Sequence, residues 1–359
     1  MVDPGSFGAN PRARGRCAPQ ARAQAPFGRM RQTDKDIHEQ ENAVSGSKRV
    51  LVTGGAGFIG SHVCEAYRNA GWEVTALDDL STGRRENLPD GVALVEEDIR
   101  SEAAADLVRG GRFDLVNHHA AQIDVRVSVS RPRLDASINI DGLLNLLEAC
   151  RDGEVPRFLF VSSGGAIYGE AGDIPSPETT LKAPLSGYGV SKLAGEHYLF
   201  TFRKLFGIEG ASLRYSNVYG PRQDPNGEAG VVAVFSSRLL AGEPLTIYGN
   251  GMQTRDYVYA GDVARANLVL TTTPLLDPTS VDDVAFNVAT GKETSVLELA
   301  DTLQTAAGAR VEISHAPARK GEVLRSCLRA EKLHGLGWEP VTTLEQGLKN
   351  TYDHIANES

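Results

Sequence analysis

The organisation of this chain is set by one stretch, KRVLVTGGAGFIG, which runs from Lys48 to Gly60. Its first part, Lys48–Thr53, is a short β-branched run of the kind that forms a buried strand. A glycine-rich turn follows, and Ser61–Ala70 then has the amphipathic pattern of a helix, which Gly71 would end. A strand, a glycine turn and a helix in this order predict a dinucleotide-binding unit, with phosphate at the helix N-terminus.

The glycines of the turn have separate expected uses. Gly54 allows the tight turn, Gly57 lets the backbone approach a pyrophosphate, and Gly60 lets the helix lie against the strand. The start of the helix, with Phe58 and Ile59, presents free N–H groups and the positive end of the helix dipole to the phosphates.

An acid follows at the distance expected for a ribose contact. The next predicted strand, Glu73–Leu77, ends in Asp78, 18 residues after Gly60. A carboxylate there accepts hydrogen bonds from both ribose hydroxyls and repels a 2′-phosphate. We therefore expect NAD rather than NADP as the cofactor.

Asp98 and Ile99 follow the predicted strand Val92–Val95 and are a candidate adenine contact. An equally good interpretation is that Asp98 caps a helix that begins near Ser101.

Strand and helix patterns alternate through the following residues, which predicts a parallel sheet with helices on both faces. Ligands then bind at the carboxyl ends of the strands. The expected elements are strands at 115–117, 158–162 and 211–214 and helices at 135–150 and 188–206.

The composition describes a globular protein with an acidic balance. The chain has 359 residues, of which 41% are hydrophobic and 23% charged, and its net charge is −9. A nucleic-acid partner would favour a basic surface, and no apolar run reaches the roughly 18–20 residues of a membrane span. The four cysteines lie far apart without metal-ligand spacing. We expect a cytoplasmic enzyme without a metal, a nucleic-acid partner or a membrane partner.

Residues 1–47 differ from the rest. Up to Arg31, six arginines stand against one acid, and prolines recur without apolar periodicity. No apolar stretch of a secretory signal is present. We expect a disordered tail, with an organelle-targeting peptide or a true start at Met30 as alternatives.

Tyr188 and Lys192 are four residues apart on one predicted helix and therefore share a face. A tyrosine with an ordinary pKa of about 10 is a weak base at neutral pH. The lysine and a positively charged nicotinamide ring would both favour the phenolate, and reaching a pKa of about 7 requires roughly 4 kcal/mol. The sequence predicts a catalytic pair; an ordinary surface pair is the alternative.

From about Lys48 to its C-terminus, the chain resembles the extended short-chain dehydrogenases/reductases and, among them, the UDP-glucose 4-epimerase family. The resemblance implies an α/β fold: a Rossmann-type doubly wound parallel sheet with a smaller α/β substrate-binding lobe. It implies an NAD-binding domain at 48–215, regained around 250–290, and a UDP-sugar-binding lobe at 216–249 and 291–359. The motifs that carry it are, in order, TGGAGFIG (53–60), HAAQIDVR (119–126), SSGGAIYG (162–169), YGVSK (188–192), NVYGPR (217–222), TRDYV (254–258) and RKGE (319–322).

The resemblance also implies an activity, the interconversion of UDP-glucose and UDP-galactose with bound NAD. Tyr188 would remove the proton of the sugar 4-OH while C4 gives a hydride to NAD⁺. The 4-keto sugar would then turn over and take the hydride back on its other face. Lys192 would also hold the nicotinamide ribose. Further implied cofactor contacts are Asn139, His119, Ala120 and Ala121, with a packing role as the alternative for the histidine.

The serine of the catalytic set departs from the pattern of many relatives. They carry Ser or Thr four residues before the motif tyrosine, Tyr168, where this chain has Gly164. Ser163 lies 25 residues before Tyr188, a spacing also found in relatives, and is expected to hydrogen-bond the sugar 4-oxygen. Ser162 is the alternative, or a strand-end hydroxyl that bonds the backbone.

The expected substrate contacts lie mostly in the second half of the chain. By resemblance, Arg255 and Arg319 would clamp the UDP diphosphate, because the arginine fork matches phosphate oxygens. Asn217 would meet the nucleotide phosphates and Glu322 the ribose, whereas Arg222 is expected at the surface.

Ser326 stands seven residues after Arg319, at a family position beside the sugar 2-substituent. A tyrosine there excludes an N-acetyl group. A serine predicts that UDP-N-acetylhexosamines are also admitted.

Alternative functions are a UDP-glucuronate 4-epimerase or decarboxylase and, from another class, a non-catalytic NAD-binding scaffold. Dehydration is disfavoured because Gly164 and Gly165 replace the Asp-Glu pair of the 4,6-dehydratases. A homodimer is expected from the resemblance of the helices 135–150 and 188–206 to a four-helix interface. Their apolar side chains could equally face the sheet; those of the first helix are Leu143, Leu144, Leu146 and Leu147.

Overall fold

The computed structural model describes residues 47–225, 230–318 and 323–358. The expected tail, apart from Ser47, lies outside these residues, as do Arg319 and Glu322.

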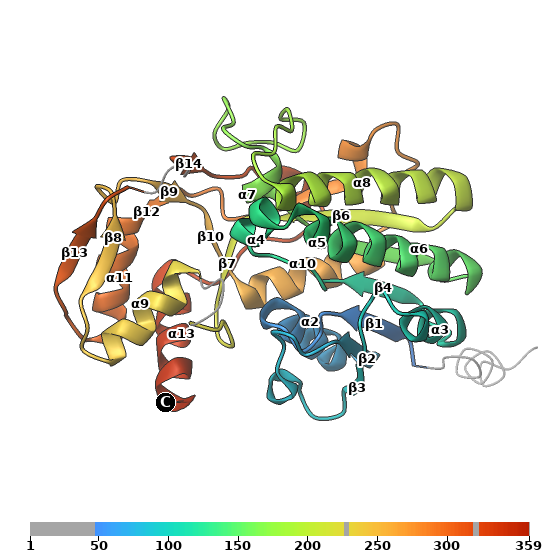
Figure 1. The fold of residues 1–359 in the computed structure, drawn as a ribbon, viewed down its shortest axis with the longest axis horizontal. Helices are drawn as coiled ribbons and strands as arrows, with labels where there is room; N and C mark the ends of the chain where they lie inside the picture. The colour runs from blue at the N-terminus through green and yellow to red at the C-terminus, as the bar shows by residue number, and fades with distance from the viewer. Residues whose placement is uncertain (1–46, 226–229, 319–322, 359) are drawn as a thin grey trace, which may run out of the picture. The chain divides into compact units, whose positions relative to one another are not determined.

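A seven-stranded sheet, parallel throughout, is the centre of the fold (Figure 1). Its strand order is β11-β6-β5-β4-β1-β2-β3, so the chain reverses direction across the sheet next to β1. This is the doubly wound arrangement that the sequence predicts. The strands are β1 (Arg49–Thr53), β2 (Glu73–Asp78), β3 (Ala93–Glu96), β4 (Leu115–His118), β5 (Arg157–Ser163), β6 (Glu209–Tyr215) and β11 (Ala285–Val288).

Both faces of the sheet are covered, as the apolar pattern of β1 requires. Val50 and Val52 pack into the core on one face, and Leu51 packs into the core on the other. The first face is covered by α2 (Phe58–Asn69) and α10 (Ala260–Thr272). The second is covered by α3 (Glu102–Gly110), α6 (Gly142–Asp152) and α8 (Gly187–Phe206).

A smaller lobe has its own apolar core, separate from the two that flank the large sheet. In Figure 1 its three helices lie beyond the β7–β10 edge, away from the large sheet. Its elements are α9 (Val231–Leu240), α11 (Val296–Ala307), α13 (Leu344–Glu358) and the parallel pair β8 (Leu245–Tyr248) and β13 (Ile313–Ala316).

Two small sheets connect the lobes. One pairs β7 (Asn217–Tyr219) with β10 (Tyr257–Tyr259) in parallel. The other has the order β12-β9-β14, with β12 (Thr294–Ser295), β9 (Thr254–Arg255) and β14 (Arg325–Ser326). Short segments complete the described chain: α4 (Val125–Ser130), α5 (Pro132–Ala136), a π turn (Ser137–Asp141), α7 (Gly164–Ile167), α12 (Glu331–His334) and 3₁₀ turns at Arg85–Asn87 and Val281–Val284.

The chain passes between the two lobes more often than the expected domain boundaries imply. After β9, the chain returns through α10 and β11 to the large sheet. Leu333 and Trp338 also pack into the core of the large sheet, although they fall within 291–359. The Trp338 indole N–H donates to the backbone oxygen of Asp262 at the start of α10, 2.9 Å away, which holds this segment there.

The helix expected at 135–150 is a helical run from Pro132 to Asp152 that contains the π turn. Leu143, Leu146 and Leu147 are fully buried against the sheet, so they belong to the core. The exposed apolar side chains of α8 include Val190, Tyr198 and Phe206. No helix among the described residues has the length and apolar character to cross a membrane. The homodimer stays a prediction.

Candidate active site

Glycines at the turn after β1 stand where a side chain would not fit. Gly54 has a φ of +65°, and a Cβ on it would lie 2.6 Å from the backbone nitrogen of Ala120. A Cβ on Gly60 would lie 2.1 Å from the carbonyl oxygen of Gly54. The helix therefore starts directly on the turn, and no side chain of the described residues caps its N-terminus at Gly57. The N–H groups of its first turn, which includes Phe58 and Ile59, are thus available to a phosphate.

Asp78 ends β2 beside this turn and is 6% exposed. Its carboxylate accepts hydrogen bonds from the backbone N–H groups of Ala56 and Leu80, both at 2.9 Å. Burial raises the pKa of this carboxyl, and the backbone donors oppose the shift. The acid is therefore held at the glycine turn, where a ribose contact requires it.

The structure excludes the alternative role of Asp98 as a helix cap, and the adenine contact stays a prediction. The carboxylate of Asp98 binds the guanidinium of Arg100, at 2.5 Å. It does not cap α3, because Ser101 is the N-cap and accepts from the backbone N–H of Ala104. Ile99 is 5% exposed and belongs to the core on the α6 side of the sheet.

At the other end of the expected cofactor site, polar side-chain atoms are buried without a hydrogen-bond partner among the described residues. Among the described residues, Nε2 of His119, Oγ of Ser162 and Oγ of Ser216 are buried without a hydrogen bond. These residues lie at the carboxyl ends of β4, β5 and β6, which are neighbours in the sheet. Burial and the Lys192 charge lower the pKa of His119 to about 3, so its ring is neutral. Ser162 does not bond the backbone, contrary to one expectation for it.

These observations fit NAD across the carboxyl edge of the sheet. The glycine turn and α2 would take the pyrophosphate, Asp78 the adenosine ribose, and the polar atoms after β4–β6 the nicotinamide half. Ala120 and Ala121 follow β4 between these two ends, and the N–H of Ala120 donates to Thr53 Oγ1 at 3.2 Å.

Tyr188 stands in the first turn of α8, which begins at the N-cap Ser186. Ser163, at the end of β5, is the side chain that lowers the pKa of this phenol, which places the two hydroxyl groups close together. A Cβ on the neighbouring Gly189 would lie 2.6 Å from the carbonyl oxygen of Ala166, so α7 and α8 are in backbone contact here. The structure thus brings Ser163, rather than Ser162, to the tyrosine.

The charge balance at Tyr188 differs from the sequence-based expectation. Burial raises the pKa of Tyr188 to about 12; the hydrogen bond with Ser163 opposes this, and the charge of Asp135 adds to it. In the protein alone, desolvation of the phenolate is the largest effect on this pKa, and the expected lowering by Lys192 together with NAD⁺ stays a prediction.

Lys192 is 3% exposed, and its ammonium donates to the carbonyl oxygen of Val161 at 2.9 Å. The ammonium lies 5.8 Å from the centre of the Tyr188 ring. Burial lowers the pKa of Lys192 to about 8, and Asp135 opposes this. Most of the lysine is therefore still charged at neutral pH.

Asp135 was not predicted, although it stands four residues before Asn139 on one helical run. It is 1% exposed and accepts hydrogen bonds from the amides of Gln122, at 2.8 Å, and Asn139, at 3.1 Å. The Asn139 amide also reaches Ser191 Oγ, next to Lys192, at 3.3 Å. Asn139 therefore connects the segment after β4 to α8 from within a buried polar cluster.

The predicted substrate residues of the second lobe lie across from Ser163. Ser326 of β14 pairs with Arg255 of β9 and lines one pocket with Gly164 and Tyr168. The side chain of Asn217 approaches Gly165, 4.0 Å from where a Cβ would stand. Arg319 and Glu322 lie outside the described residues.

Asp256, next to Arg255, was also missed. Its 1% exposed carboxylate accepts from the hydroxyl of Thr290 at 2.7 Å and from the N–H of Gly291 at 2.9 Å. It also accepts from the thiol of Cys327 at 3.5 Å. One carboxylate thus fixes the segments that carry Arg255 and Ser326, and only its place in the TRDYV motif marked it in the sequence.

Arg222 is not at the surface as expected. Its side chain is 16% exposed, bonded to Glu65 at 2.6 Å and to His62 at 2.9 Å. Its φ of 68° turns the chain toward α2, where these two partners lie. It therefore ties the loop after β7 to the helix at the glycine turn.

Comparisons with known proteins agree with this geometry. A model of the NAD dependent epimerase/dehydratase family matches residues 50–289. The UDP-glucose 4-epimerase of Mycolicibacterium smegmatis is 41% identical over 87% of this chain and 99% of its own length.

Two solved structures are also similar. A UDP-glucose 4-epimerase of Thermotoga maritima, solved with UDP-glucose, has a TM-score of 0.82 at 43% identity, over 86% of this chain and 99% of that one. A UDP-glucose 4-epimerase of Thermus thermophilus, solved with NAD, has a TM-score of 0.80 at 44% identity, over 87% and 100%. The chain therefore belongs to the NAD-dependent epimerase/dehydratase family, as an NAD-dependent epimerase.

Proposed function

We propose that this chain is a UDP-hexose 4-epimerase that interconverts UDP-glucose and UDP-galactose and also accepts the N-acetylhexosamine pair. The observation that carries the proposal is the placement of Ser163 and the Lys192 ammonium beside the Tyr188 phenol, at the carboxyl edge of the sheet. The names of the relatives support the UDP-sugar class.

In the proposed mechanism, the hydroxyl groups of Ser163 and Tyr188 both contact the sugar 4-oxygen. Ser163 hydrogen-bonds it, and Tyr188 accepts the proton of the 4-OH and returns it at the end. Lys192 keeps a positive charge next to the phenol, which favours its ionised form. When bound, NAD supplies the hydride-accepting and hydride-donating chemistry at C4.

Inversion requires space for the 4-keto sugar to present its other face, and the chain supplies small residues there. A Cβ on Gly165 would meet only Asn217 Oδ1, at 4.0 Å, among the described atoms. Because residue 165 is a glycine, it supplies no carboxyl group for dehydration, which agrees with epimerisation.

Tyr188→Phe tests the proposed base. General acid–base groups typically contribute about 100- to 10,000-fold, so we expect kcat for UDP-galactose to fall by that factor. Because the substitution removes one hydroxyl, co-purified NAD should be retained. The change is measured by proton NMR of C4 inversion.

Tyr198→Phe is the matched control, because Tyr198 is on the same helix but 40% exposed. It should retain wild-type kcat. Full activity of Tyr188→Phe would contradict the proposed role of Tyr188. If the unaltered protein converts UDP-glucuronate and no UDP-hexose, the substrate is a uronate and the proposed hexose is wrong.

Asp135→Asn tests the electrostatics of the site. The Asp135 charge raises the pKa of both Tyr188 and Lys192, so its removal lowers both. In the enzyme with NAD bound, whose positive ring would lower the pKa of Tyr188, proton loss from Tyr188 sets the low-pH limb of kcat and proton loss from Lys192 sets the high-pH limb. Both limbs then move to lower pH in the variant. His118 and His119, which also face Lys192, stay neutral throughout because burial lowers the pKa of each.

The control for this variant is Asp141→Asn, an exposed carboxylate on the same helical run. Its pH profile should coincide with that of the wild type. A profile of Asp135→Asn that is lower at every pH but not displaced would show that the carboxylate acts only in packing.

Ser326→Tyr tests the admitted sugars. A tyrosine in the pocket shared with Gly164 and Tyr168 would fill the space beside the sugar 2-substituent. An unaccommodated acetamide group costs a few kcal/mol, so turnover of UDP-N-acetylgalactosamine should fall about 10- to 200-fold. Turnover of UDP-galactose should change little; equal turnover of the N-acetylated substrate by both proteins would contradict the hypothesis.

A further inference from the structure

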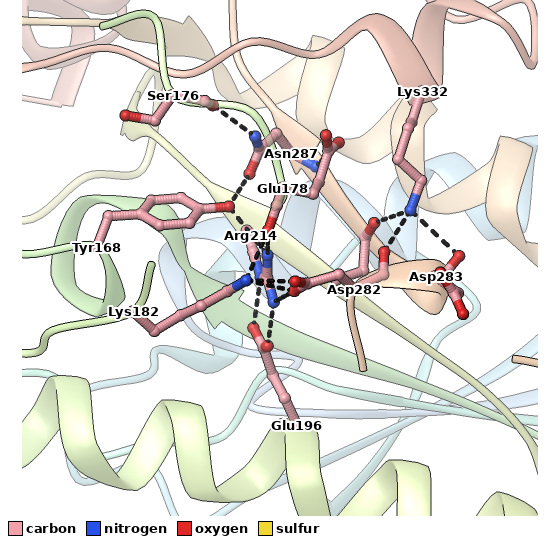
Figure 2. Close-up of polar contacts among 11 residues, drawn as sticks. Tyr168, Ser176, Glu178, Lys182, Glu196, Arg214, Asp282, Asp283, Asn287 and Lys332 are labelled. Atoms are coloured by element: carbon pink, nitrogen blue, oxygen red, sulfur yellow. Dashed lines mark hydrogen bonds and ion pairs between the residues drawn. The ribbon is translucent and has the colours of Figure 1, made fainter. Parts of the chain in front are cut away.

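A buried cluster of charges is centred on Arg214 of β6, whose partner in the sheet register is Ser162, next to Ser163 (Figure 2). The Arg214 side chain is fully buried. Its Nε and Nη2 donate to the two carboxylate oxygens of Glu196, at 2.9 and 2.6 Å. Its remaining donors reach the Tyr168 hydroxyl at 3.0 Å, the Glu178 carbonyl at 2.8 Å and the Asp282 carboxylate at 2.9 Å.

One arm of this cluster holds the helix of the catalytic tyrosine. Glu196 is on α8, four residues after Lys192 and eight after Tyr188. Residues four apart lie on one face of a helix, so the three side chains form a single stripe. The bidentate contact with Arg214 therefore fixes the height and rotation of this stripe above the sheet.

The other arm holds the segment of the catalytic serine. Tyr168 is the C-cap of α7, whose N-cap is Ser163. The Tyr168 hydroxyl accepts from Arg214 and donates to Asn287 Oδ1 at 2.9 Å. In the register of β5 and β6, Arg214 stands opposite Ser162, next to Ser163. Arg214 thus contacts both the segment that carries Ser163 and the helix that carries Tyr188.

Stability alone does not account for this arrangement. Removing charges from water is costly, and replacing a buried ion pair by apolar residues of similar volume is often neutral or stabilising. A bidentate pair does provide fixed distances and angles, which an apolar contact does not. Proton transfer along a hydrogen bond depends strongly on the distance and angle between the donor and acceptor groups.

We infer that the Arg214–Glu196 pair is a positioning device that sets the Ser163–Tyr188 geometry for catalysis. The inference rests on the proposed function of that pair. It assigns the buried ion pair a role in kcat rather than in substrate binding or in folding.

The direct test replaces both charges, with Arg214→Met and Glu196→Leu in one chain. The other partners keep a hydrogen bond each: Asp282 and the Glu178 carbonyl with Lys182, and Tyr168 with Asn287. We expect the unfolding temperature and the co-purified NAD to stay near wild type. kcat for UDP-galactose should fall, on the order of 10- to 100-fold, with KM unchanged.

The matched control removes an ion pair between β5 and β6, the strands that carry Ser163 and Arg214. Arg157 and Glu209 are bonded at the opposite ends of β5 and β6, away from Ser163. Arg157→Met with Glu209→Leu should lower the unfolding temperature, because Arg157 also holds three backbone carbonyls near Thr271. It should leave kcat unchanged, which separates loss of stability from loss of positioning.

Tyr168→Phe keeps the inference testable if the double variant does not fold. It removes only the hydroxyl arm and leaves the Arg214–Glu196 pair, so kcat should fall several-fold at constant KM. An unchanged kcat in either folded variant overturns the inference. A wild-type protein that converts no UDP-sugar would instead overturn the proposed function.

Discussion

Gly60 packs so closely on the turn after β1 that a Cβ would lie 2.1 Å from the carbonyl oxygen of Gly54. This contact starts α2 directly above the end of β1 and leaves its first N–H groups open toward the carboxyl edge of the sheet. The same turn packs on Ala120 after β4, and its Ala56 N–H donates a hydrogen bond to Asp78 at the end of β2. Three strand ends therefore meet around one glycine-rich turn, and the expected cofactor site lies where they meet.

Charge at the catalytic end is governed by burial. Desolvation raises the pKa of Tyr188 and lowers those of Lys192 and His119, so each group is moved toward its neutral form. Asp135 opposes this at Lys192, and the hydrogen bond from Ser163 opposes it at Tyr188. As the proposed base, Tyr188 would depend on charge that arrives with the cofactor, which would couple proton removal to the presence of NAD⁺.

Local motifs predicted much of this arrangement. The strand–glycine–helix unit, Asp78 and the Tyr188–Lys192 spacing are each contained in a few consecutive residues, so the sequence alone reveals them. The pKa of Tyr188 could not be predicted, because its burial depends on segments distant in the chain. Arg222 was misplaced for the same reason: its partners Glu65 and His62 lie more than 150 residues away. Asp256 and Arg214 escaped notice because their roles consist of contacts among several strands and loops.

The central claim is that C4 of a UDP-sugar is oxidised and reduced within one site. The most direct test gives the protein UDP-galactose with deuterium at C4, in ordinary water and without added NAD. We expect UDP-glucose that retains the deuterium at C4, because the C4 hydrogen leaves and returns without exchange with solvent. UDP-glucose with hydrogen from water at C4, or no inversion at all, would contradict it.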